Sequence, residues 1–292
     1  MKTYYDCIEC FVRQAVDAAR LFTDDEKIHD RILSKVIKQS SEMNFYLSPP
    51  EQGKIIHDII REILKDGDPY SDIKERSNRF ALKLYPELKK KIEQSSDPVE
   101  MAVRFAIAGN IIDMGASSHY DENSIRKTID GALNKPLLAE TIDAFRDAVE
   151  QASDILYLGD NAGEIVFDRL LLEQFPREKI TFVVRGGPVL NDATRVDAQN
   201  AGLMNIVNVI DNGSNAPGTI LGDCSSEFRE LFNKADLIIA KGQGNYESLS
   251  DTNKNIVFLL MAKCPLIAND IGCEVGDMIV KTVFSGRMIS QI

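Results

Sequence analysis

Consecutive oxygen donors stand in the segment Gly159-Asp160-Asn161-Ala162-Gly163-Glu164, directly after an apolar run at residues 155–158. Neighbouring carboxylate and amide oxygens suit Mg²⁺ or Mn²⁺, and glycine lets the backbone turn tightly against a ligand. A helix that begins after such a turn presents free N–H groups to an anion. The same residues could also form an ordinary strand-to-helix turn with Asp or Asn as the N-cap. Taken alone, the segment does not choose between a metal and phosphate site and a capped turn.

Two further apolar runs are followed by residues that could complete such a site. After the second run come Arg185-Gly186-Gly187-Pro188 and Asn191-Asp192, so Asp192 could give a second carboxylate to the same cation. Arg185 could pair with Asp192 or with a phosphate. After the third run, the segment from Asp211 to Thr219 contains Ser214 and is rich in hydroxyl, amide and glycine groups. That composition suits a phosphate or sugar loop, although ordinary loops share it.

A lysine follows the fourth apolar run, in Lys241-Gly242-Gln243-Gly244-Asn245-Tyr246. A cation at that position could neutralise a phosphate or the leaving oxygen of a phosphoryl transfer. The fifth run leads to Asn269-Asp270, another pair of amide and acid. Ligands of parallel sheets bind beyond the carboxyl ends of the strands. We therefore expect one metal and phosphate site, formed by Asp160, Asn161, Asp192 and Lys241.

The spacing of apolar residues changes near residue 150. Before it, apolar residues recur every three or four positions, which predicts a helical region of roughly six or seven helices over residues 1–150. After it, short apolar runs alternate with helical stretches, which predicts an α/β domain over residues 151–292 with a doubly wound, mostly parallel sheet. The predicted strands are residues 155–158, 180–184, 206–210, 237–240 and 265–268, and the predicted helices are 164–174, 192–201, 225–233 and 253–262.

Composition narrows the class of partner. The chain has 292 residues, of which 44% are hydrophobic and 27% charged, as in a globular protein. Its net charge of -11 repels the phosphates of nucleic acids and anionic membranes, so we expect neither as a partner. A phosphorylated small molecule remains compatible with this charge, because a divalent cation can invert the potential inside a pocket.

The cysteines and the first residues of the chain indicate the cellular compartment. No apolar run reaches the roughly 18 residues of a membrane span, and the first ten residues are polar and charged, unlike a signal peptide. Five cysteines, an odd number, favour reduced thiols. We therefore expect a cytoplasmic protein. Cys7 and Cys10 form a CxxC motif, which could supply soft metal ligands, a redox pair or packed structural thiols.

Taken together, these motifs resemble the damage-control phosphatases, a family long described only as a domain of unknown function. The matching segments are Gly159 to Glu164, Arg185-Gly186 with Asn191-Asp192, and Lys241 to Tyr246. Cys7-Ile8-Glu9-Cys10 and Gly109-Asn110-Ile111-Ile112-Asp113 resemble marks of the family's prokaryotic branch. The resemblance runs from Tyr5 to about Gly276 and implies a Rossmann-like sheet with a helical N-terminal region.

The resemblance also implies an activity and a set of site residues. It implies a metal-dependent phosphatase of phosphorylated small metabolites, such as sugar phosphates or damaged or surplus phosphometabolites, that uses Mn²⁺, Mg²⁺, Co²⁺ or Ni²⁺. Asp160, Asn161 and Asp192 would bind the metal and Lys241 the phosphate, with Asp160, Asp192 and Lys241 as the catalytic residues. The residues expected to contact the substrate are Asn110, Asp113, Gly159, Arg185, Ser214, Gly242 and Asn245. The eukaryotic branch has Asp where this chain has Gln243, and it lacks the CxxC, so its substrates do not carry over.

Two routes of phosphate transfer fit the acids. Water activated by the metal could attack phosphorus directly, or Asp160 could attack and form an aspartyl phosphate. The second route usually needs an acid two residues later, where this chain has Ala162, so attack by water is favoured. Glu164, Asp113 or Asp270 could serve as the base.

Other functions fit part of the pattern. A glycine turn with an acid after the first strand is compatible with a carboxyl methyltransferase that uses S-adenosylmethionine. However, Gly159 to Gly163 lacks the usual spacing of three glycines, and Lys241 has no role in that chemistry. The same loops could also bind a phosphorylated metabolite without turning it over, as in a sensor. A thiol redox protein would rest on the CxxC alone.

Overall fold

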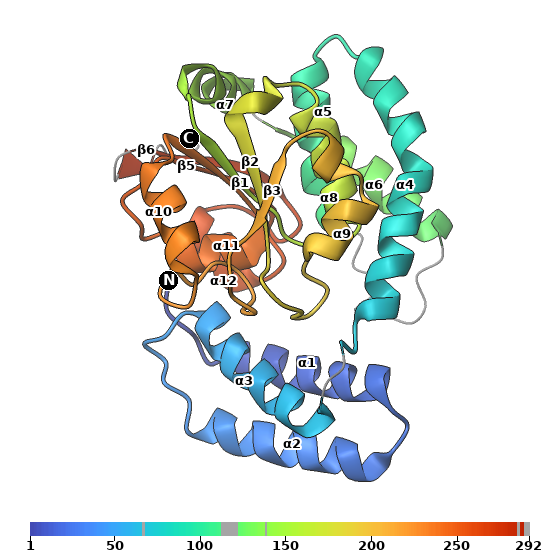
Figure 1. Cartoon of the computed structure of the whole chain (residues 1–292), viewed down its shortest axis with the longest axis vertical. Coiled ribbons are helices and arrows are strands. Elements are labelled where there is room, and N and C mark those ends of the chain that lie inside the picture. The colour runs from blue at the N-terminus through green and yellow to red at the C-terminus, as the bar shows by residue number, and fades with distance from the viewer. Residues whose placement is uncertain (66–67, 112–121, 138, 285–286, 289–292) are drawn as a thin grey trace.

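A computed structural model describes residues 1–65, 68–111, 122–137, 139–284 and 287–288 (Figure 1). Within these residues, seven strands form one sheet in the order β3-β2-β1-β4-β5-β6-β7. Neighbours among β1 to β5 are parallel, whereas β6 pairs antiparallel with β5 and with β7. The strands are β1 (Ile155–Leu158), β2 (Ile180–Val184), β3 (Asn208–Asp211), β4 (Leu237–Lys241), β5 (Ile256–Met261), β6 (Met278–Phe284) and β7 (Arg287–Met288).

Among the described residues, seven α-helices precede β1 and five follow it. Several begin at capping residues: the Asp97 carboxylate accepts a hydrogen bond from the N–H of Glu100 at 2.9 Å, and Ser48 and Glu51 form a capping box. The helices are α1 (Cys7–Phe22), α2 (Glu26–Ser41), α3 (Pro49–Leu64), α4 (Ser71–Glu93), α5 (Pro98–Ala108), α6 (Glu122–Leu133), α7 (Ala139–Gln151), α8 (Glu164–Leu172), α9 (Arg195–Asn200), α10 (Ser226–Lys234), α11 (Gly242–Leu249) and α12 (Pro265–Ile271).

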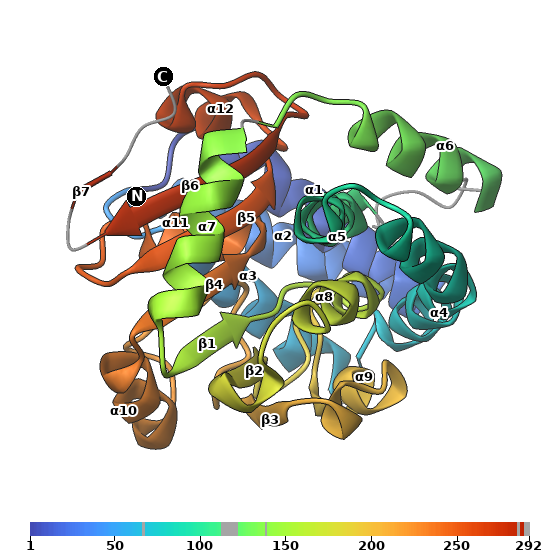
Figure 2. The same cartoon turned by 90° about the horizontal axis from the view of Figure 1, so that it is seen from above.

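Helices cover both faces of the sheet (Figure 2), because side chains along each strand alternate between two hydrophobic cores. Ile155 and Tyr157 of β1 pack in the core that includes residues of α4, α5, α7 and α8. Leu156 and Leu158 pack in the core that includes residues of α10, α11 and α12. This arrangement confirms the predicted Rossmann-like α/β class with a mostly parallel sheet.

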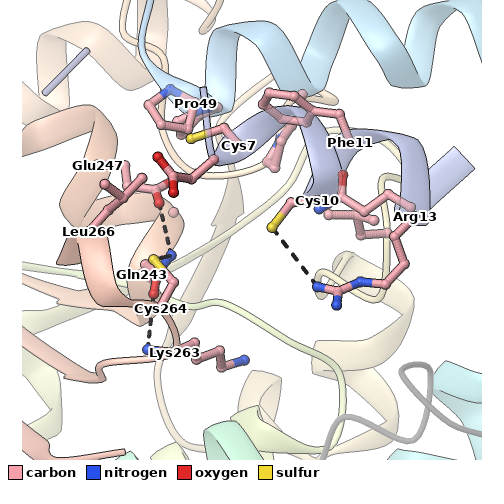
Figure 3. A pocket seen from close by; sticks show the side chains of 18 of the residues that line it. Cys7, Cys10, Phe11, Arg13, Pro49, Gln243, Glu247, Lys263, Cys264 and Leu266 are labelled. Atoms are coloured by element: carbon pink, nitrogen blue, oxygen red, sulfur yellow. Dashed lines mark hydrogen bonds between the residues drawn. The ribbon is translucent and has the colours of Figure 1, made fainter. Parts of the chain in front are cut away.

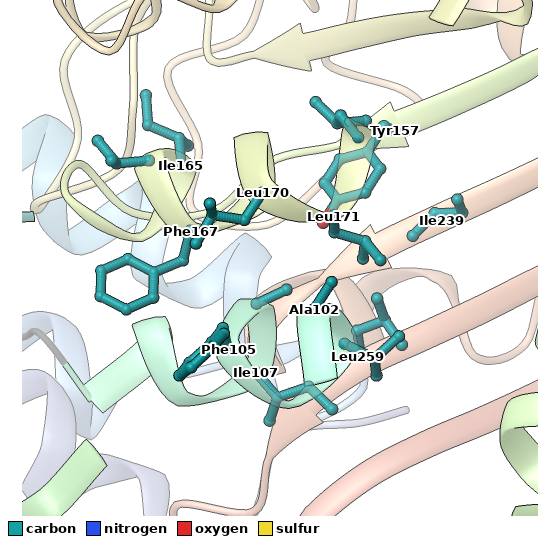
Figure 4. Close-up of a cluster of buried hydrophobic side chains, with 14 of the residues drawn as sticks. Ala102, Phe105, Ile107, Tyr157, Ile165, Phe167, Leu170, Leu171, Ile239 and Leu259 are labelled. Atoms are coloured by element: carbon teal, nitrogen blue, oxygen red, sulfur yellow. The ribbon is translucent and has the colours of Figure 1, made fainter. Parts of the chain in front are cut away.

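The packing of α5 against α8 fixes one wall of the region where β1 ends (Figure 4). Phe105 of α5 and Phe167 of α8 are both fully buried in this core. Burial of such a side chain contributes about 1.5–3 kcal/mol. A Cβ on Gly109 would lie 3.1 Å from the Phe167 side chain, so glycine lets the short 3₁₀ helix η1 (Gly109–Ile111) lie against α8. As a result, Asn110 stands beside the start of α8.

The last predicted strand and helix were assigned to the wrong segments. Residues 253–262, predicted as a helix, contain β5, and residues 265–268, predicted as a strand, lie in α12. Pro265 occupies the first turn of α12, a position that suits proline because the N–H there needs no partner. Periodicity cannot separate a short buried strand from a buried helix segment, and β5 is apolar on both faces because its side chains pack in the hydrophobic cores on the two sides of the sheet.

The first three helices form a hydrophobic cluster of their own and lie beneath the loops that follow the strands (Figure 1). Arg61 of α3 donates a hydrogen bond to the carbonyl oxygen of Pro188 at 3.3 Å, and Lys54 pairs with Asp223 at 3.6 Å. These contacts hold α3 against the loops after β2 and β3. The assignment of residues 1–150 and 151–292 to separate domains remains a prediction, and hydrophobic contacts cross that boundary. None of the helices in the described segments is long and apolar enough to span a membrane.

Candidate active site

The turn after β1 carries the first acid and amide of the site. Gly163, which precedes α8, has φ +80° and donates its N–H to the Asn78 side chain at 2.7 Å. A Cβ on Gly159 would lie 2.7 Å from the Phe182 ring, so glycine is needed where the chain leaves the sheet. The turn places Asp160 and Asn161 at the carboxyl edge of the sheet, where both side chains are largely buried.

The loop after β2 runs beside this turn and brings the second acid to it. The N–H of Ala193 donates to the carbonyl of Asp160 at 2.8 Å, and Asn161 forms an isolated antiparallel bridge with Asp192. Backbone hydrogen bonds therefore hold Asp160, Asn161 and Asp192 together, as the strand-end pattern predicts. All three line one cavity.

Two amide side chains fix the orientation of the acids. The Asn110 nitrogen donates to Asp160 Oδ2 at 3.1 Å and to Glu164 Oε2 at 2.7 Å. The Asn161 nitrogen donates to the same two oxygens, each at 2.9 Å. Because both hydrogens of the Asn161 amide go to carboxylates, its oxygen is the end left for a ligand.

Arg185 pairs with acids of the site. Its Nε lies 2.6 Å from Asp192 Oδ2, and its Nη2 lies 3.5 Å from Asp160 Oδ1. The side chain is 2% exposed and does not line the cavity. Of the two partners that the sequence allows for Arg185, the structure shows the carboxylate.

Lys241 lies away from the cavity, contrary to the expectation that it contacts phosphate. Because side chains alternate along β4, Lys241 lies on the same face of the sheet as Leu237 and Ile239, the face that α5 and α8 cover. The ammonium is fully buried and donates to Glu164 at 2.7 Å, to Asp168 at 2.6 Å and to the carbonyl of Ala106 at 2.8 Å. All three of its hydrogens are therefore used within the protein.

Two more predicted substrate contacts are satisfied internally. The Asn245 amide donates to the carbonyl of Lys241 at 2.7 Å and accepts from the Thr219 hydroxyl at 2.7 Å. The Ser214 hydroxyl donates to Asp223 and accepts from the N–H of Ala216. Both side chains are buried outside the cavity lining, so they shape the loops rather than face a ligand.

Of the three candidate bases, none faces the cavity among the described residues. Glu164 is fully buried against Lys241. Asp270 accepts a hydrogen bond from the Tyr246 hydroxyl at 2.7 Å and is not part of the lining. Asp113, also predicted to contact substrate, lies outside the described residues.

Gly242 allows the closest approach in the site. It has φ +77°, and a Cβ built on it would lie 1.9 Å from Asp160 Oδ2. Any other residue would displace the Asp160 carboxylate. Gly242 therefore positions Asp160 by making room for it.

The buried acids of the site outnumber its cations. When ionised, four carboxylates face two cations, which leaves two negative charges unbalanced; the groups are Asp160, Glu164, Asp168 and Asp192 with Lys241 and Arg185. Burial is the main cause that raises the pKa of Asp160 to about 8, and repulsion from Glu164 and Asp192 adds to it. Burial also raises the pKa of Asp192.

A divalent cation would balance these charges. The donors that face the cavity are two carboxylates and one amide oxygen, from Asp160, Asp192 and Asn161, and hard oxygen ligands suit Mg²⁺ and Mn²⁺. Within the described residues, no group of three or more His, Cys, Asp or Glu side chains is arranged as a metal site. The candidate set differs from such groups because its third member is an amide.

The cavity that these three side chains line has a volume of about 570 Å³ (Figure 3). Its walls come from the first turns of α1, the start of α3, the start of α11 and the loop between β5 and α12. This volume suits a small metabolite.

Three polar residues of the wall, Gln243, Glu247 and Lys263, were not among the predicted site residues, although Gln243 lies within the lysine motif. Gln243 donates to Glu247 at 2.9 Å and accepts from the N–H of Lys263 at 3.2 Å. Burial raises the pKa of Glu247 to about 7, against the lowering effect of the Gln243 hydrogen bond. Glu247 directly follows the lysine motif and lies one helical turn after Gln243, and that spacing is the signal that could have identified it.

Cys7 and Cys10 of α1 line the cavity, and Cys264 lies on another wall (Figure 3). All three are free thiols, and burial raises the pKa of Cys7 and of Cys10. Arg13 lies 3.9 Å from the Cys10 sulfur. The CxxC is therefore part of the pocket wall.

Comparison with known proteins gives a consistent match along nearly the whole chain. The family model of the damage-control phosphatase ARMT1-like domain matches residues 3–279. An uncharacterised protein of Methanocaldococcus jannaschii is 39% identical over 290 residues, which cover 94% of this chain and 93% of that protein. A damage-control phosphatase of Archaeoglobus fulgidus is 38% identical over 285 residues, which cover 95% of this chain and 98% of that protein. A crystal structure of a DUF89 family protein from Pyrococcus horikoshii superposes with a TM-score of 0.87 at 33% identity, covering 96% of this chain and 98% of that one.

Proposed function

Because this chain belongs to the damage-control phosphatase ARMT1-like family, we propose that it is a metal-dependent phosphatase that hydrolyses phosphomonoesters of small metabolites. Relatives that are named damage-control phosphatases support a phosphatase-type function. Sugar phosphates and damaged or surplus phosphometabolites are the proposed substrates. The observation that carries the proposal is the excess of buried carboxylates at the floor of a cavity of metabolite size.

Asp160, Asn161 and Asp192 are the residues that would hold the cation, which we propose to be Mn²⁺, Mg²⁺, Co²⁺ or Ni²⁺. When bound, a divalent cation supplies Lewis-acid polarisation of the phosphoryl group and offsets its charge. The raised pKa of Asp160 supports this assignment, because a carboxylate that repels its neighbours gains most from a cation.

The surrounding residues hold the ligands in place. Asn110 binds Asp160 and Glu164 together, so the Asp160 carboxylate keeps one orientation. Lys241 balances Glu164 and Asp168 from below, and its ion pairs join β4 to α8. We therefore treat Lys241 as a positioning residue. Ala162 stands where an aspartyl-phosphate route needs an acid, which favours direct attack by water.

Glu247 is the proposed proton-transfer group. Its pKa of about 7 lets the carboxyl hold a proton near neutral pH, and it lines the cavity that contains Asp160. In this proposal the Glu247 carboxyl gives its proton to the leaving alkoxide oxygen. Gln243, which donates to Glu247 at 2.9 Å, orients the carboxyl for that transfer.

Release of inorganic phosphate from a panel of sugar, nucleotide and cofactor phosphates tests the function. We expect release with Mn²⁺, Mg²⁺, Co²⁺ or Ni²⁺, loss of activity with a chelator, and at least roughly 100-fold lower turnover in Asp160→Ala. A panel without turnover under any metal would contradict the phosphatase and favour a metabolite sensor. Heat of binding of S-adenosylmethionine without phosphate release would favour the methyltransferase.

A further inference from the structure

Arg13 of α1 is a cation of the cavity wall that no part of the proposed mechanism uses. Its side chain is exposed and lines the same cavity as Asp160 and Asp192. Among the described residues, the guanidinium group has a single hydrogen-bond partner, the Cys10 sulfur at 3.9 Å, and forms no ion pair. Because a thiol sulfur is a weak acceptor, most of the five N–H donors of Arg13 remain available to a ligand.

The neighbouring acid on α1 does not pair with Arg13. Glu9 precedes Arg13 by four residues, the spacing at which a glutamate and a following basic residue ordinarily pair on a helix. The guanidinium group instead lies beside the Cys10 sulfur, which also belongs to the cavity wall (Figure 3). The charge of Arg13 is therefore directed at the cavity and is not balanced by an ion pair with Glu9.

Gln14 adds hydrogen-bond donors to the same wall. Its side-chain oxygen lies 3.4 Å from Nε2 of His57, and because a carbonyl oxygen can only accept, His57 is the donor. Burial lowers the pKa of His57 to about 4, so the ring is neutral near neutral pH and gives its N–H to this contact. The amide nitrogen of Gln14, which has no acceptor within the described part of the chain, is left for a ligand.

The α1 wall faces the proposed metal ligands across the cavity. Asp160, Asn161 and Asp192 stand in the loops at the carboxyl edge of the sheet, and α1 lies beyond those loops, on the side away from the strands (Figure 1). A substrate with its phosphoryl group at these acids would extend its organic part toward α1. The donors of Arg13 and Gln14 would then meet acceptor groups on that part of the molecule.

We propose that Arg13 binds a second anionic group of the substrate, carried on the organic part of the phosphomonoester. This inference rests on the proposed phosphatase function and narrows the substrates to phosphomonoesters that also bear a carboxylate or a further phosphate. The planar guanidinium group matches either anion with two parallel hydrogen bonds, and Gln14 supplies a further donor beside them. A neutral hydroxyl group would gain less from Arg13, because only an anion adds attraction between opposite charges.

Two pairs of substrates and three variants test this role. Phosphoglycerate and glycerol phosphate differ by one carboxylate, and fructose bisphosphate and fructose phosphate differ by one phosphate. Arg13→Gln removes the charge, and Arg13→Lys keeps it without the planar fork. Arg20→Gln changes the net charge of the same helix by the same amount, at an exposed position outside the cavity lining. The measurement is the ratio of kcat/KM within each pair, with Mn²⁺ present and with each variant shown to be folded by circular dichroism.

In the wild type we expect the more anionic member of at least one pair to be preferred. In Arg13→Gln we expect that preference to fall roughly 10-fold to 100-fold, the loss typical of a hydrogen bond to a charged group. Arg13→Lys should retain part of the preference, and Arg20→Gln should keep the wild-type ratios.

The two pairs also identify the second anion. A fall confined to the phosphoglycerate pair would assign a carboxylate, and a fall confined to the fructose pair would assign a phosphate; either result supports the contact. A wild type without preference, or an Arg13→Gln with unchanged ratios in both pairs, would overturn the inference and leave the phosphatase function intact.

A failure of the function itself gives a different result. If the wild type releases no phosphate, calorimetry with the same compounds and Mn²⁺ tests the contact separately. Tighter binding of the more anionic member of either pair, lost in Arg13→Gln and kept in Arg20→Gln, would still support the role of Arg13. Equal affinities within both pairs of the wild type, or the same affinities in Arg13→Gln as in Arg20→Gln, would overturn it.

Discussion

Replacing Gly242 with alanine should disable the site through the position of one carboxylate. The change adds two separable costs. The backbone at Gly242 has φ +77°, which costs an alanine about 1–2 kcal/mol. The new Cβ would also lie 1.9 Å from Asp160 Oδ2, where 3.4 Å is an ordinary contact, so the carboxylate would have to move by about 1.5 Å. A misplacement of about 1 Å can cost roughly 100-fold in rate.

Gly272 provides the matched control for the backbone cost. It has φ +87° at the end of α12, and a Cβ there would meet no atom within 4 Å. Gly272→Ala should therefore lose about 1–2 kcal/mol in the free energy of unfolding with little change in activity. Gly242→Ala should lose stability as well, and kcat/KM should fall at least roughly 100-fold.

The assay compares urea unfolding, phosphate release with Mn²⁺, and the rise in melting temperature that Mn²⁺ causes. In Gly242→Ala we expect the thermal effect of Mn²⁺ to shrink together with activity. A folded Gly242→Ala with wild-type kcat/KM and a wild-type Mn²⁺ effect would refute the reasoning, because Asp160 could then move without consequence.

Four further predictions concern charge. Lys241→Met should lower the free energy of unfolding in urea by roughly 3–5 kcal/mol, because it leaves two buried carboxylates unpaired. Lys89→Met, which breaks the ion pair between the half-exposed Lys89 and Glu173, should lower it by no more than about 1 kcal/mol. Equal losses in the two variants would contradict this account. Because Asp160 has its pKa raised to about 8, the metal-free folded state binds more protons than the unfolded state between about pH 4 and 8, so its stability should fall as pH rises through that window. Mn²⁺ competes with that proton, so its thermal shift should be larger at pH 8 than at pH 6, and Asp160→Asn should remove the difference. Glu247→Gln should lower kcat and abolish the decline in rate above about pH 7, whereas Glu227→Gln on the exposed face of α10 should leave the pH profile unchanged.

Much of the site can be predicted from local sequence. Asp160 and Asn161 lie in the turn after β1 and Asp192 lies in the loop after β2, and the carboxyl ends of parallel strands meet at one edge of the sheet. Neighbouring strands β1 and β2 therefore bring the three residues together with little influence from distant parts of the chain. Asn110 joins them through the packing of α5 on α8, which the short Gly109-Asn110 motif indicates only by its resemblance.

The assignment of the last strand required tertiary information. The apolar run of β5 satisfies a helical and a strand interpretation equally, because a strand covered on both faces has no alternation. Its neighbours β4 and β6 decide the matter by supplying backbone hydrogen bonds on both sides. As a consequence, Lys263 follows a strand and enters the cavity wall, where the sequence assignment had placed it after a helix.

The sequence alone determined the α/β class, the helical start of the chain and the edge of the sheet that bears the acids. Those features depend on periodicity and on strand ends, which are local properties. Which lysine faces the cavity was decided only by the tertiary structure. Lys241 follows an apolar run as the motif predicts, but the alternation of β4 turns it toward α8, where Glu164 and Asp168 bind it. Lys263 faces the pocket because α1 and α3 close the space around it from a distant part of the chain.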